Sequence, residues 1–586
     1  MGSSMDGGAD VGSEPQPEGV VTQRVTNGDR SALFAELPEK PVFAPGGNPL
    51  PTITIDTGAT FQTMDGFGFT LTEGAAEVIG ALPDGVQSDL LEEVFHPERG
   101  IGVSVVRISI GASDLSSSSY SYQEFKGYSG ATAPIGSYVT LRGAVNGKYV
   151  SSENGESPMH CNRASASSWE TFRVVEAGSG RIALQAASNG KYVTGASPMY
   201  ADGASLGGAE QFAWLSPAPG QVQLQSVSSG YFVSSEDGIE AMTCNRTEAS
   251  GWETFDVSAA TFSLSGPDLD NTIPILKKVL AIDPGIKVLA TPWTAPTWMK
   301  SNFEWVGGSL QVSYYDAYAE YFEKYVSAMQ GQGIPIWAIT PQNEPLNPYN
   351  EPSMKMTAAE QASFVKGHLG PSLSKAGHKA KIIAYDHNCD DIGYPISVCK
   401  DAAEWVDGSA FHLYAGSISA LTTVHDATNK NVYLTEQWTS STGDFAGDLA
   451  WHTENVTIGG ASNWARAVLE WNLATDPSYG PHTAGGCTTC QGALTVSGGG
   501  YARNVSFYIL AHLAKLVRPG AVRVGSVSDD PELLHVAFEN DAAGGGAKVL
   551  VVLNKGGGAR SFNLSRGGES VTVSLNGGSV GTYSWH

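Results

Sequence analysis

The run Ile336-Trp-Ala-Ile-Thr-Pro-Gln-Asn-Glu-Pro345 is a short apolar segment that ends in a polar turn carrying a glutamate. A second run, Asn431-Val-Tyr-Leu-Thr-Glu436, has the same form. Short apolar runs are typical of strands that are buried on both faces, as in a parallel sheet. A glutamate at the end of such a strand is costly to bury unless it is paired or hydrogen-bonded. The two apolar runs therefore indicate a parallel sheet, and the glutamates at their ends are candidate site residues.

Similar apolar runs recur along the chain and alternate with helical patterns. In 314–329, for example, Tyr and Met residues recur at steps of three and four and so form one apolar helix face. The predicted strands are a first one near 65–70 and then 103–109, 286–291, 336–340, 381–386, 409–413, 431–435 and 466–473. Eight β/α units predict an α/β fold of the (β/α)8 TIM-barrel type.

One spacing in this series is too long, because the second and third strands start 183 residues apart. The extra length is an internal repeat of three copies of about forty residues. Asn146-Gly-Lys-Tyr-Val150 recurs as Asn189-Gly-Lys-Tyr-Val193, and Trp169-Glu-Thr-Phe172 recurs as Trp252-Glu-Thr-Phe255. Alternating apolar residues around Asn-Gly turns indicate short hairpins. The repeat resembles a fascin-like β-trefoil, inserted in the loop after the second strand, and both a spacer and a carbohydrate-binding role remain open for it.

The domain organisation follows from these patterns. After residue 516 only strand patterns occur, which predicts an antiparallel β side domain that the N-terminal strands join. The expected segments are a disordered leader 1–20, N-terminal strands 21–64, a first barrel segment 65–125, the inserted β-trefoil 126–258, a second barrel segment 259–515 and the side domain 516–586.

Composition restricts the ligands. The 586 residues carry 34 Lys and Arg against 59 Asp and Glu, a net charge of −25. Phosphate recognition depends on clustered Lys and Arg, so nucleic acid and anionic membranes are disfavoured as partners. The sequence contains no run of eighteen apolar residues, so no membrane span is predicted.

The six cysteines are interpreted as structural. Cys389 and Cys399, and likewise Cys487 and Cys490, are close enough in the sequence to close local loops.

Polar residues at barrel strand ends are the functional candidates. Glu344 and Glu436 follow the fourth and seventh strands, and two carboxylates across a barrel mouth fit retaining glycoside hydrolysis without metal or cofactor. Repulsion from an ionised Glu436 is expected to raise the pKa of Glu344 and to keep it protonated. Aromatic strand-end residues are expected to stack on sugar faces, Asn343 to hold a sugar hydroxyl and His412 to orient Glu436 or the substrate. The aromatic candidates are Trp293, Tyr414, Trp438 and Trp471.

These motifs resemble glycoside hydrolase family 30, the glucocerebrosidase-like enzymes, over everything except the leader and the repeat. The matching segments are Asp65-Gly-Phe-Gly68, Thr291-Pro-Trp-Thr-Ala-Pro-Thr-Trp298, Thr340-Pro-Gln-Asn-Glu-Pro345, Phe411-His-Leu-Tyr414, Leu434-Thr-Glu-Gln-Trp438 and Glu470-Trp-Asn-Leu-Ala474. The resemblance implies that Glu344 is the acid/base and Glu436 the nucleophile. It implies sugar-binding roles for Trp293, Asn343, His412, Tyr414, Trp471, Glu73 and Arg107.

Two departures from the family pattern bear on substrate. Glu73 and His482-Thr483 stand where cerebroside-cleaving members carry Asp and Asn-Trp, and the segments around Phe411, Trp451 and Pro481 look more like the β-1,6-glucanase subfamily. The expected function is therefore a secreted, retaining endo-β-1,6-glucanase acting on a neutral β-glucan. The alternatives are a β-glucosidase or glucosylceramidase of the same family, or a carbohydrate-binding protein without catalysis.

Overall fold

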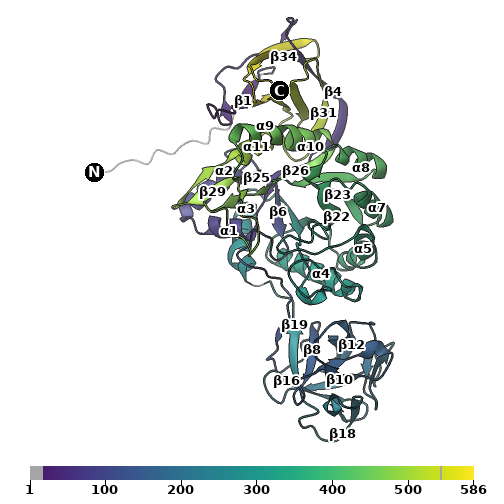
Figure 1. Ribbon diagram of the computed structural model, residues 1–586. Coiled ribbons are helices and arrows are strands. Elements are labelled where there is room, and N and C mark those ends of the chain that lie inside the picture. Colours follow the sequence, from purple (N-terminus) through teal and green to yellow (C-terminus); the bar gives the residue numbers. More distant parts are fainter. Residues whose placement is uncertain (1–17, 265, 542–543) are drawn as a thin grey trace, which may run out of the picture.

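The computed structural model describes residues 18–264, 266–541 and 544–586. The predicted disordered leader 1–20 therefore lies almost wholly outside the described residues. Figure 1 shows three units in a row: a β unit with the C-terminus at the top, a helix-ringed barrel in the middle, and a second β unit at the bottom, where the strands from β8 to β19 lie.

The central unit is a closed barrel of eight parallel strands, as the strand pattern predicts. Its strands in chain order are β5 (Gly66–Thr70), β6 (Val105–Ser109), β20 (Lys287–Thr291), β21 (Ile336–Ile339), β22 (Lys381–Cys389), β23 (Val406–Gly416), β24 (Asn431–Glu436) and β26 (Ala465–Asn472). The first two strands approach closely at Gly68, where a Cβ atom would lie 1.6 Å from the carbonyl oxygen of Val105. A side chain is therefore excluded at this position of the Asp65-Gly-Phe-Gly68 motif.

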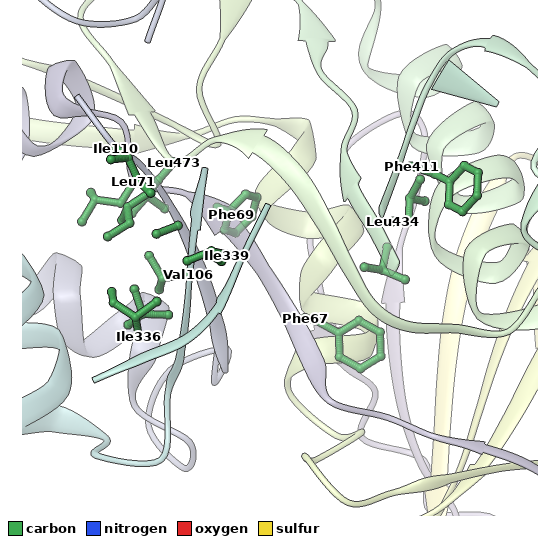
Figure 2. Close-up of a cluster of buried hydrophobic side chains, with 14 of the residues drawn as sticks. Phe67, Phe69, Leu71, Val106, Ile110, Ile336, Ile339, Phe411, Leu434 and Leu473 are labelled. Atoms are coloured by element: carbon green, nitrogen blue, oxygen red, sulfur yellow. The ribbon is translucent and has the colours of Figure 1, made fainter. Parts of the chain in front are cut away.

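Alternate residues of the barrel strands face opposite sides, as strand geometry requires. The inward-facing residues form a small buried cluster of Val105, Leu289, Ala338, Ile383, Ala410, Tyr433, Ala467 and Leu469. Outward-facing neighbours such as Phe67, Val106 and Leu434 belong to the large core between the strands and the helices (Figure 2). The barrel interior is therefore filled by one apolar layer, above which the strand ends carry polar side chains.

The helices surround the barrel. In α4 the predicted apolar face is confirmed, because Tyr318, Tyr321, Tyr325 and Met329 are all buried. The helices are α1 (Glu73–Gly80), α2 (Asp84–Phe95), α3 (Ile273–Ile282), α4 (Tyr315–Gly331), α5 (Ala358–Phe364), α6 (Gly370–Lys375), α7 (Gly393–Asp401), α8 (Ala420–Thr428), α9 (Phe445–His452), α10 (Gly459–Ser462) and α11 (Val505–Ala514).

The lower β unit leaves the barrel after β6 and returns before α3. Its strands form a sheet of their own and bury a core in which the repeat positions meet, including Leu141, Leu184 and Leu224 with Phe172, Phe212 and Phe255. The strands are β7 (Lys126–Gly127), β8 (Tyr138–Gly143), β9 (Tyr149–Ser151), β10 (His160–Arg163), β11 (Thr171–Gly178), β12 (Arg181–Ala186), β13 (Tyr192–Thr194), β14 (Tyr200–Gly203), β15 (Phe212–Leu215), β16 (Gln221–Ser226), β17 (Phe232–Ser234), β18 (Thr243–Arg246) and β19 (Phe255–Ala260). We call this unit the insert.

The insert contacts the barrel at the start of α4. Arg173 forms an ion pair with Glu320 at 3.0 Å, and the Tyr314 hydroxyl lies 3.1 Å from Thr171 Oγ1. Tyr138 packs on Trp298 with ring centroids 5.2 Å apart. Because α4 is the helix that follows barrel strand β20, its start lies at the end of the barrel at which the strands terminate, and the insert is held beside that end.

The upper β unit combines both ends of the chain, as predicted. Its ten-stranded sheet has the order β2-β1-β36-β33-β32-β31-β4-β34-β35-β3, so that N-terminal strands β1 and β4 pair with C-terminal strands. The strands are β1 (Thr22–Thr26), β2 (Ala35–Glu36), β3 (Ala44–Pro45), β4 (Thr52–Thr63), β31 (Val522–Ser528), β32 (Leu533–Glu539), β33 (Lys548–Asn554), β34 (Arg560–Arg566), β35 (Glu569–Leu575) and β36 (Ser579–Trp585).

The cysteines divide into two groups. Cys487 and Cys490 form a disulfide, whereas the other four thiols are buried and unbonded, including Cys389 and Cys399. Cys389 and Cys399 are therefore structural as buried thiols and not as a bonded pair, since Cys389 ends a barrel strand and Cys399 lies on α7 facing Ser409. Within the described residues, none of the helices combines the length and apolarity that crossing a bilayer requires.

Candidate active site

A polar layer lies directly above the apolar layer of the barrel interior. Arg107 comes two residues after the inward-facing Val105, and His412 comes two residues after Ala410, so both side chains point into the barrel. Both are fully buried. A buried arginine and a buried histidine need acidic partners, and the ends of the neighbouring strands supply them.

Glu436 is held on both of its carboxylate oxygens. Arg107 Nη1 donates to Oε2 at 2.5 Å, and the Tyr414 hydroxyl donates to Oε1 at 2.7 Å. Burial lowers the pKa of Arg107, but the charges of Asp386 and Glu436 outweigh it and the net pKa is raised. The guanidinium is therefore permanently charged and holds the Glu436 carboxylate in a fixed orientation.

Glu344 lies on the turn after β21, in the left-handed backbone region with φ +45°. Such a conformation is strained for a non-glycine residue and is concentrated at functional sites. Its Oε1 lies 3.1 Å from His412 Nδ1, and its Oε2 accepts a hydrogen bond from Asn347 Nδ2 at 2.8 Å.

The pKa of Glu344 departs from the expected direction. Burial raises the pKa of Glu344. The hydrogen bond and charge of His412, together with the hydrogen bond from Asn347, lower it by more than burial raises it, so the net pKa is below the ordinary value. The expectation of a raised pKa considered only the repulsion from Glu436. It was wrong for the substrate-free cleft because an imidazolium lies next to Glu344.

His412 is charged for a reason that the sequence does not reveal. Burial lowers its pKa, but the charge of Glu436 and the hydrogen bonds to Asp386 and Glu344 raise it to about 10. Its Nε2 lies 3.2 Å from Asp386 Oδ1, so each ring nitrogen faces a carboxylate. His412 therefore orients Glu344 at 3.1 Å more directly than Glu436, which lies 3.6 Å from Nδ1.

Asp386 contacts both buried cations, Arg107 and His412. It is fully buried and accepts hydrogen bonds from Arg107, Thr340 and Thr435 at 3.1, 2.8 and 2.7 Å. Burial raises its pKa, but the charge of Arg107 and the bonds from His412 and Thr435 hold it well below the ordinary value. The strand predicted over 381–386 ends at this residue, whereas β22 continues to Cys389.

The two glutamates face each other across this network. One ligand atom each from Glu344, His412 and Glu436 lies within 4.8 Å of the others. Carboxylates in retaining glycosidases stand about 5–5.5 Å apart, whereas inverting enzymes need about 6.5–9.5 Å. Among the described residues the same three side chains are also close enough together to hold a metal ion, but both ring nitrogens of His412 already face carboxylates, Nδ1 towards Glu344 at 3.1 Å and Nε2 towards Asp386 at 3.2 Å.

The cleft above the network is lined by half of the ten predicted site residues. Its volume is about 360 Å3, and its walls include Glu344, Tyr414, Glu436, Trp438 and Trp471 together with Asp114, Asn347, Asn350, Asn388 and the disulfide Cys487–Cys490. Arg107, Asn343 and His412 lie beneath the carboxylates. Arg107 Nη2 donates to Asn343 Oδ1 at 2.6 Å, which turns the amide nitrogen of Asn343 into the available donor.

Two predicted residues are placed differently from expectation. Trp293 is 1% exposed and packs against Trp471 at 5.5 Å and against the Arg107 guanidinium at 4.9 Å. A sugar therefore has no face of this ring to stack on, although its buried indole nitrogen lacks a protein acceptor among the described residues. Glu73 begins α1 and accepts hydrogen bonds from Ser117 N and Asn271 Nδ2 at 2.9 and 2.7 Å, and it does not line the cleft.

Asp114 is the cleft residue that the sequence reading overlooked. It lies in the loop after β6, is 6% exposed, and its Oδ1 is buried without a hydrogen-bond partner among the described residues. Burial, and next the charge of Glu436, raise its pKa to about 7. A buried acid with an unpaired oxygen beside two glutamates is suited to bind a ligand hydroxyl. Its position in the loop after the second strand was the signal that could have found it.

Comparison with known proteins agrees with this geometry. Residues 64–129 and 244–517 match the glycosyl hydrolase family 30 TIM-barrel domain, and residues 520–583 match the beta sandwich domain of that family. The chain is 37% identical over 286 residues to endo-1,6-beta-D-glucanase neg1 of Aspergillus fumigatus, covering 44% of this chain and 57% of that protein. It is 36% identical over 319 residues to an endo-1,6-beta-D-glucanase of Neurospora crassa, covering 52% and 65%.

A solved structure extends the likeness over the full chain. The endo-beta1,6-glucanase BT3312 is 28% identical, with a TM-score of 0.70 over 97% of this chain and 99% of that one. The alignments to the two curated relatives span less than two thirds of their own lengths. The family match covers the barrel and the C-terminal strands of the upper β unit, and it leaves out the N-terminal strands β1 to β4 and residues 130–243 of the insert. With its barrel, the C-terminal strands of its side domain and the turn that carries Glu344 all inside those matched segments, the chain belongs to glycosyl hydrolase family 30.

Proposed function

We propose that this protein is a retaining glycoside hydrolase that cuts β-1,6-linked glucan at internal linkages. The observation that carries the proposal is the approach of Glu344 and Glu436 to within 4.8 Å at the mouth of the barrel. That spacing leaves room for a sugar carbon between the carboxylates and no room for an additional water, as double displacement requires. The likeness to proteins named endo-1,6-beta-glucanases supports the choice of linkage.

In the first step Glu436 attacks the anomeric carbon. The bond from that carbon to the glycosidic oxygen breaks, and Glu344 gives its proton to the departing oxygen. Arg107 and Tyr414 hold one oxygen of Glu436 each, so the nucleophile is pre-oriented before the substrate arrives.

Glu344 must be protonated for this step, although its pKa is lowered in the substrate-free cleft. A sugar in the cleft displaces water from around Glu344, which favours the neutral carboxyl. The proton comes from solvent as the substrate enters, because His412, whose pKa is raised to about 10, keeps its own proton. We therefore assign His412 as a positioning residue that orients the Glu344 carboxyl from 3.1 Å.

In the second step water hydrolyses the glycosyl ester on Glu436. Esterification removes the negative charge of Glu436, and Glu344, now ionised, takes a proton from the water that attacks the anomeric carbon. Configuration is retained because the carbon is inverted twice. The amide nitrogen of Asn343, oriented by Arg107, is placed to bind the 2-hydroxyl, a bond that strengthens in the transition state.

The cleft chemistry supports a neutral glucan. Trp438 and Trp471 form apolar walls, and Asn347, Asn350 and Asn388 offer amide groups suited to hydroxyls. No Arg or Lys is among the residues that line this cleft, whereas a uronic acid calls for such a partner. The β-1,6 linkage adds a rotatable carbon and gives a kinked chain, which suits a bent cleft.

For the insert we propose a β-trefoil that binds polysaccharide. Its support is the threefold repeat, whose Leu and Phe positions meet in one core apart from the barrel. We also propose secretion as the localisation, supported by the disulfide between Cys487 and Cys490, since disulfides persist in oxidising compartments.

The test is the early product distribution from linear β-1,6-glucan, with β-1,4-glucan, glucuronoxylan and glucosylceramide in parallel. We expect short oligosaccharides from the β-1,6-glucan and little action on the others. Glucose as the sole early product would favour an exo-acting β-glucosidase. Cleavage of glucosylceramide without action on the glucan would replace the proposal by a glucosylceramidase activity, and no turnover of any substrate would favour a binding protein.

A further inference from the structure

Two of the three copies in the insert carry the same exposed aromatic residue. Trp169 and Trp252 occupy equivalent positions and are 40% and 41% exposed. Neither belongs to the core of the insert. Two half-exposed indoles at matching positions contribute little to folding, so another reason for their presence is needed.

The same charged group lies next to the glutamate that follows each tryptophan. In the first copy Arg163 Nη2 donates to both oxygens of Glu153, at 2.7 and 2.6 Å, and Arg163 Nε lies 3.8 Å from Glu170. In the third copy Arg246 Nη2 donates to both oxygens of Glu236, at 2.8 and 2.7 Å, with Nε 3.8 Å from Glu253. Each arginine is thereby fixed with its Nη1 left for a ligand.

The backbone joins each indole to its charged group. Ser152 N donates to the Trp169 carbonyl at 2.8 Å, and Ser235 N donates to the Trp252 carbonyl at the same distance. The next residues, Glu153 and Glu236, have left-handed φ angles of 49° and 47°. The strained turn that places each glutamate is therefore reproduced in both copies.

The second copy lacks the tryptophan, the arginine and the turn glutamate, but it keeps the backbone bond, which Gly195 N donates to the Ala209 carbonyl at 2.8 Å, and it keeps the following glutamate as Glu210. By the repeat register, Ala209 stands in place of the tryptophan, Gly203 in place of the arginine and Ala196 in place of the glutamate. Its core positions Leu184, Val193 and Phe212 are nevertheless buried like those of the other copies. The fold of a copy therefore does not require the Trp–Arg–Glu group, and its presence in two copies is separable from folding.

We propose that Trp169 and Trp252, each with its Arg–Glu pair, form two equivalent binding sites for a neutral β-glucan chain. The apolar face of a glucose ring stacks on an indole, while an oriented guanidinium and carboxylate bond its hydroxyls. Single indoles separated by polar surface are too small for a stable protein interface, which buries about 1,200–2,000 Å2. Two sites tethered to a barrel raise the local concentration of chain at the cleft.

The proposal rests on the proposed glucan substrate, so binding and hydrolysis are measured separately. The full-length Glu436→Gln variant, which holds glucan without cutting it, is run in affinity gels containing linear β-1,6-glucan. We expect Trp169→Ala and Trp252→Ala each to weaken retention about fivefold to tenfold and the double substitution to weaken it further. Trp169→Phe with Trp252→Phe, which keeps an aromatic face, should restore part of the retention.

Leu215→Ala is the matched control, because Leu215 is an exposed apolar side chain of the second copy. Its retention should equal that of the parent, and circular dichroism of each variant verifies folding. If the protein hydrolyses the glucan but the double variant is retained like the parent, the two sites are refuted and the proposed function stands. If the protein fails to hydrolyse the glucan while the double variant loses retention, the proposed function falls and the sites stand.

Discussion

The barrel mouth and the insert both pair arginine with glutamate, but they do so in different surroundings. At the mouth the side chains of Arg107, Asp386 and Glu436 are 0–8% exposed. In the insert Arg163 and Arg246 are 41% and 38% exposed. Buried ion pairs are strongly coupled and costly to break, whereas exposed pairs contribute little to stability. The comparison teaches that the same type of ion pair can do two different things. At the mouth it fixes the catalytic carboxylate before substrate binds, and in the insert it stays accessible to a ligand.

The largest expected effect is on chemistry at the mouth. Glu436→Ala should reduce kcat on the order of 10^4-fold or more, because the nucleophile has no substitute. Azide should restore turnover with inverted product. Glu344→Ala should keep slow activity on aryl glucosides with good leaving groups, which need no acid, and azide should rescue it with retention.

Glu470→Gln is the matched control for those variants. Glu470 is also a buried barrel glutamate, but its contact is His452 Nδ1 at 2.8 Å and it does not line the cleft. Steady-state rates and proton NMR of the anomeric centre report the result. An intact enzyme that releases inverted product would contradict the assigned roles.

The next effect compares the ion pairs directly. Arg107→Ala leaves Asp386 and Glu436 buried without their cation, which should lower the free energy of unfolding by about 3–5 kcal/mol. Arg246→Ala breaks a pair whose side chains are 38% and 13% exposed, so it should cost less, about 1 kcal/mol. Urea unfolding of both variants measures the difference. Equal costs would mean that burial does not distinguish the two regions.

A third prediction concerns Asp114, whose folded-state pKa is about 7. The unfolded chain releases this proton near pH 4, so this group lowers the free energy of unfolding as pH rises from about 4 to 7. Asp114→Asn mimics the protonated carboxyl. The variant should therefore become progressively more stable than the parent over that range and keep a constant advantage above pH 7.

Activity should move in the opposite direction. Loss of the Asp114 oxygen that faces the cleft should lower kcat/KM on oligosaccharides about tenfold to a hundredfold. Urea unfolding at pH 5 and pH 8 tests the stability change, and steady-state kinetics test the activity change. An Asp114→Asn variant with parental kcat/KM would show that the acid serves the fold and does not touch substrate.

The strand pattern predicted most of the fold because its signals are local. Every barrel strand is a run of apolar residues, and the copies of the insert share turn motifs such as Asn146-Gly-Lys-Tyr-Val150. The ends of β22 and β23 were set too short, since polar residues such as His387 and Asn388 interrupt the apolar pattern while hydrogen bonding continues.

The site could be predicted only in outline. Glu344 and Glu436 were singled out by their place after apolar runs, whereas Arg107 was given a sugar-binding role and in the structure is paired with Glu436 and Asp386. The charge state of His412 depends on three acids that come from different strands, so no local pattern reveals it. The burial of Trp293 between Arg107 and Trp471 likewise depends on packing across the barrel.

The smallest expected effect concerns the disulfide that lines the cleft. Cys487 and Cys490 are three residues apart and lie beside Trp438 and Trp471, whereas the insert has buried thiols in place of any such bond. Closing so short a loop removes little chain entropy, about 2 kcal/mol at most. Replacing both cysteines by serine should leave the thermal midpoint almost unchanged. It should raise KM for oligosaccharides about twofold to threefold, because the rim beside the tryptophan walls is less ordered. Kinetics on long glucan and on a short aryl glucoside separate the two regions: a larger loss on the short substrate would mean that the bond supports the reacting centre rather than the rim.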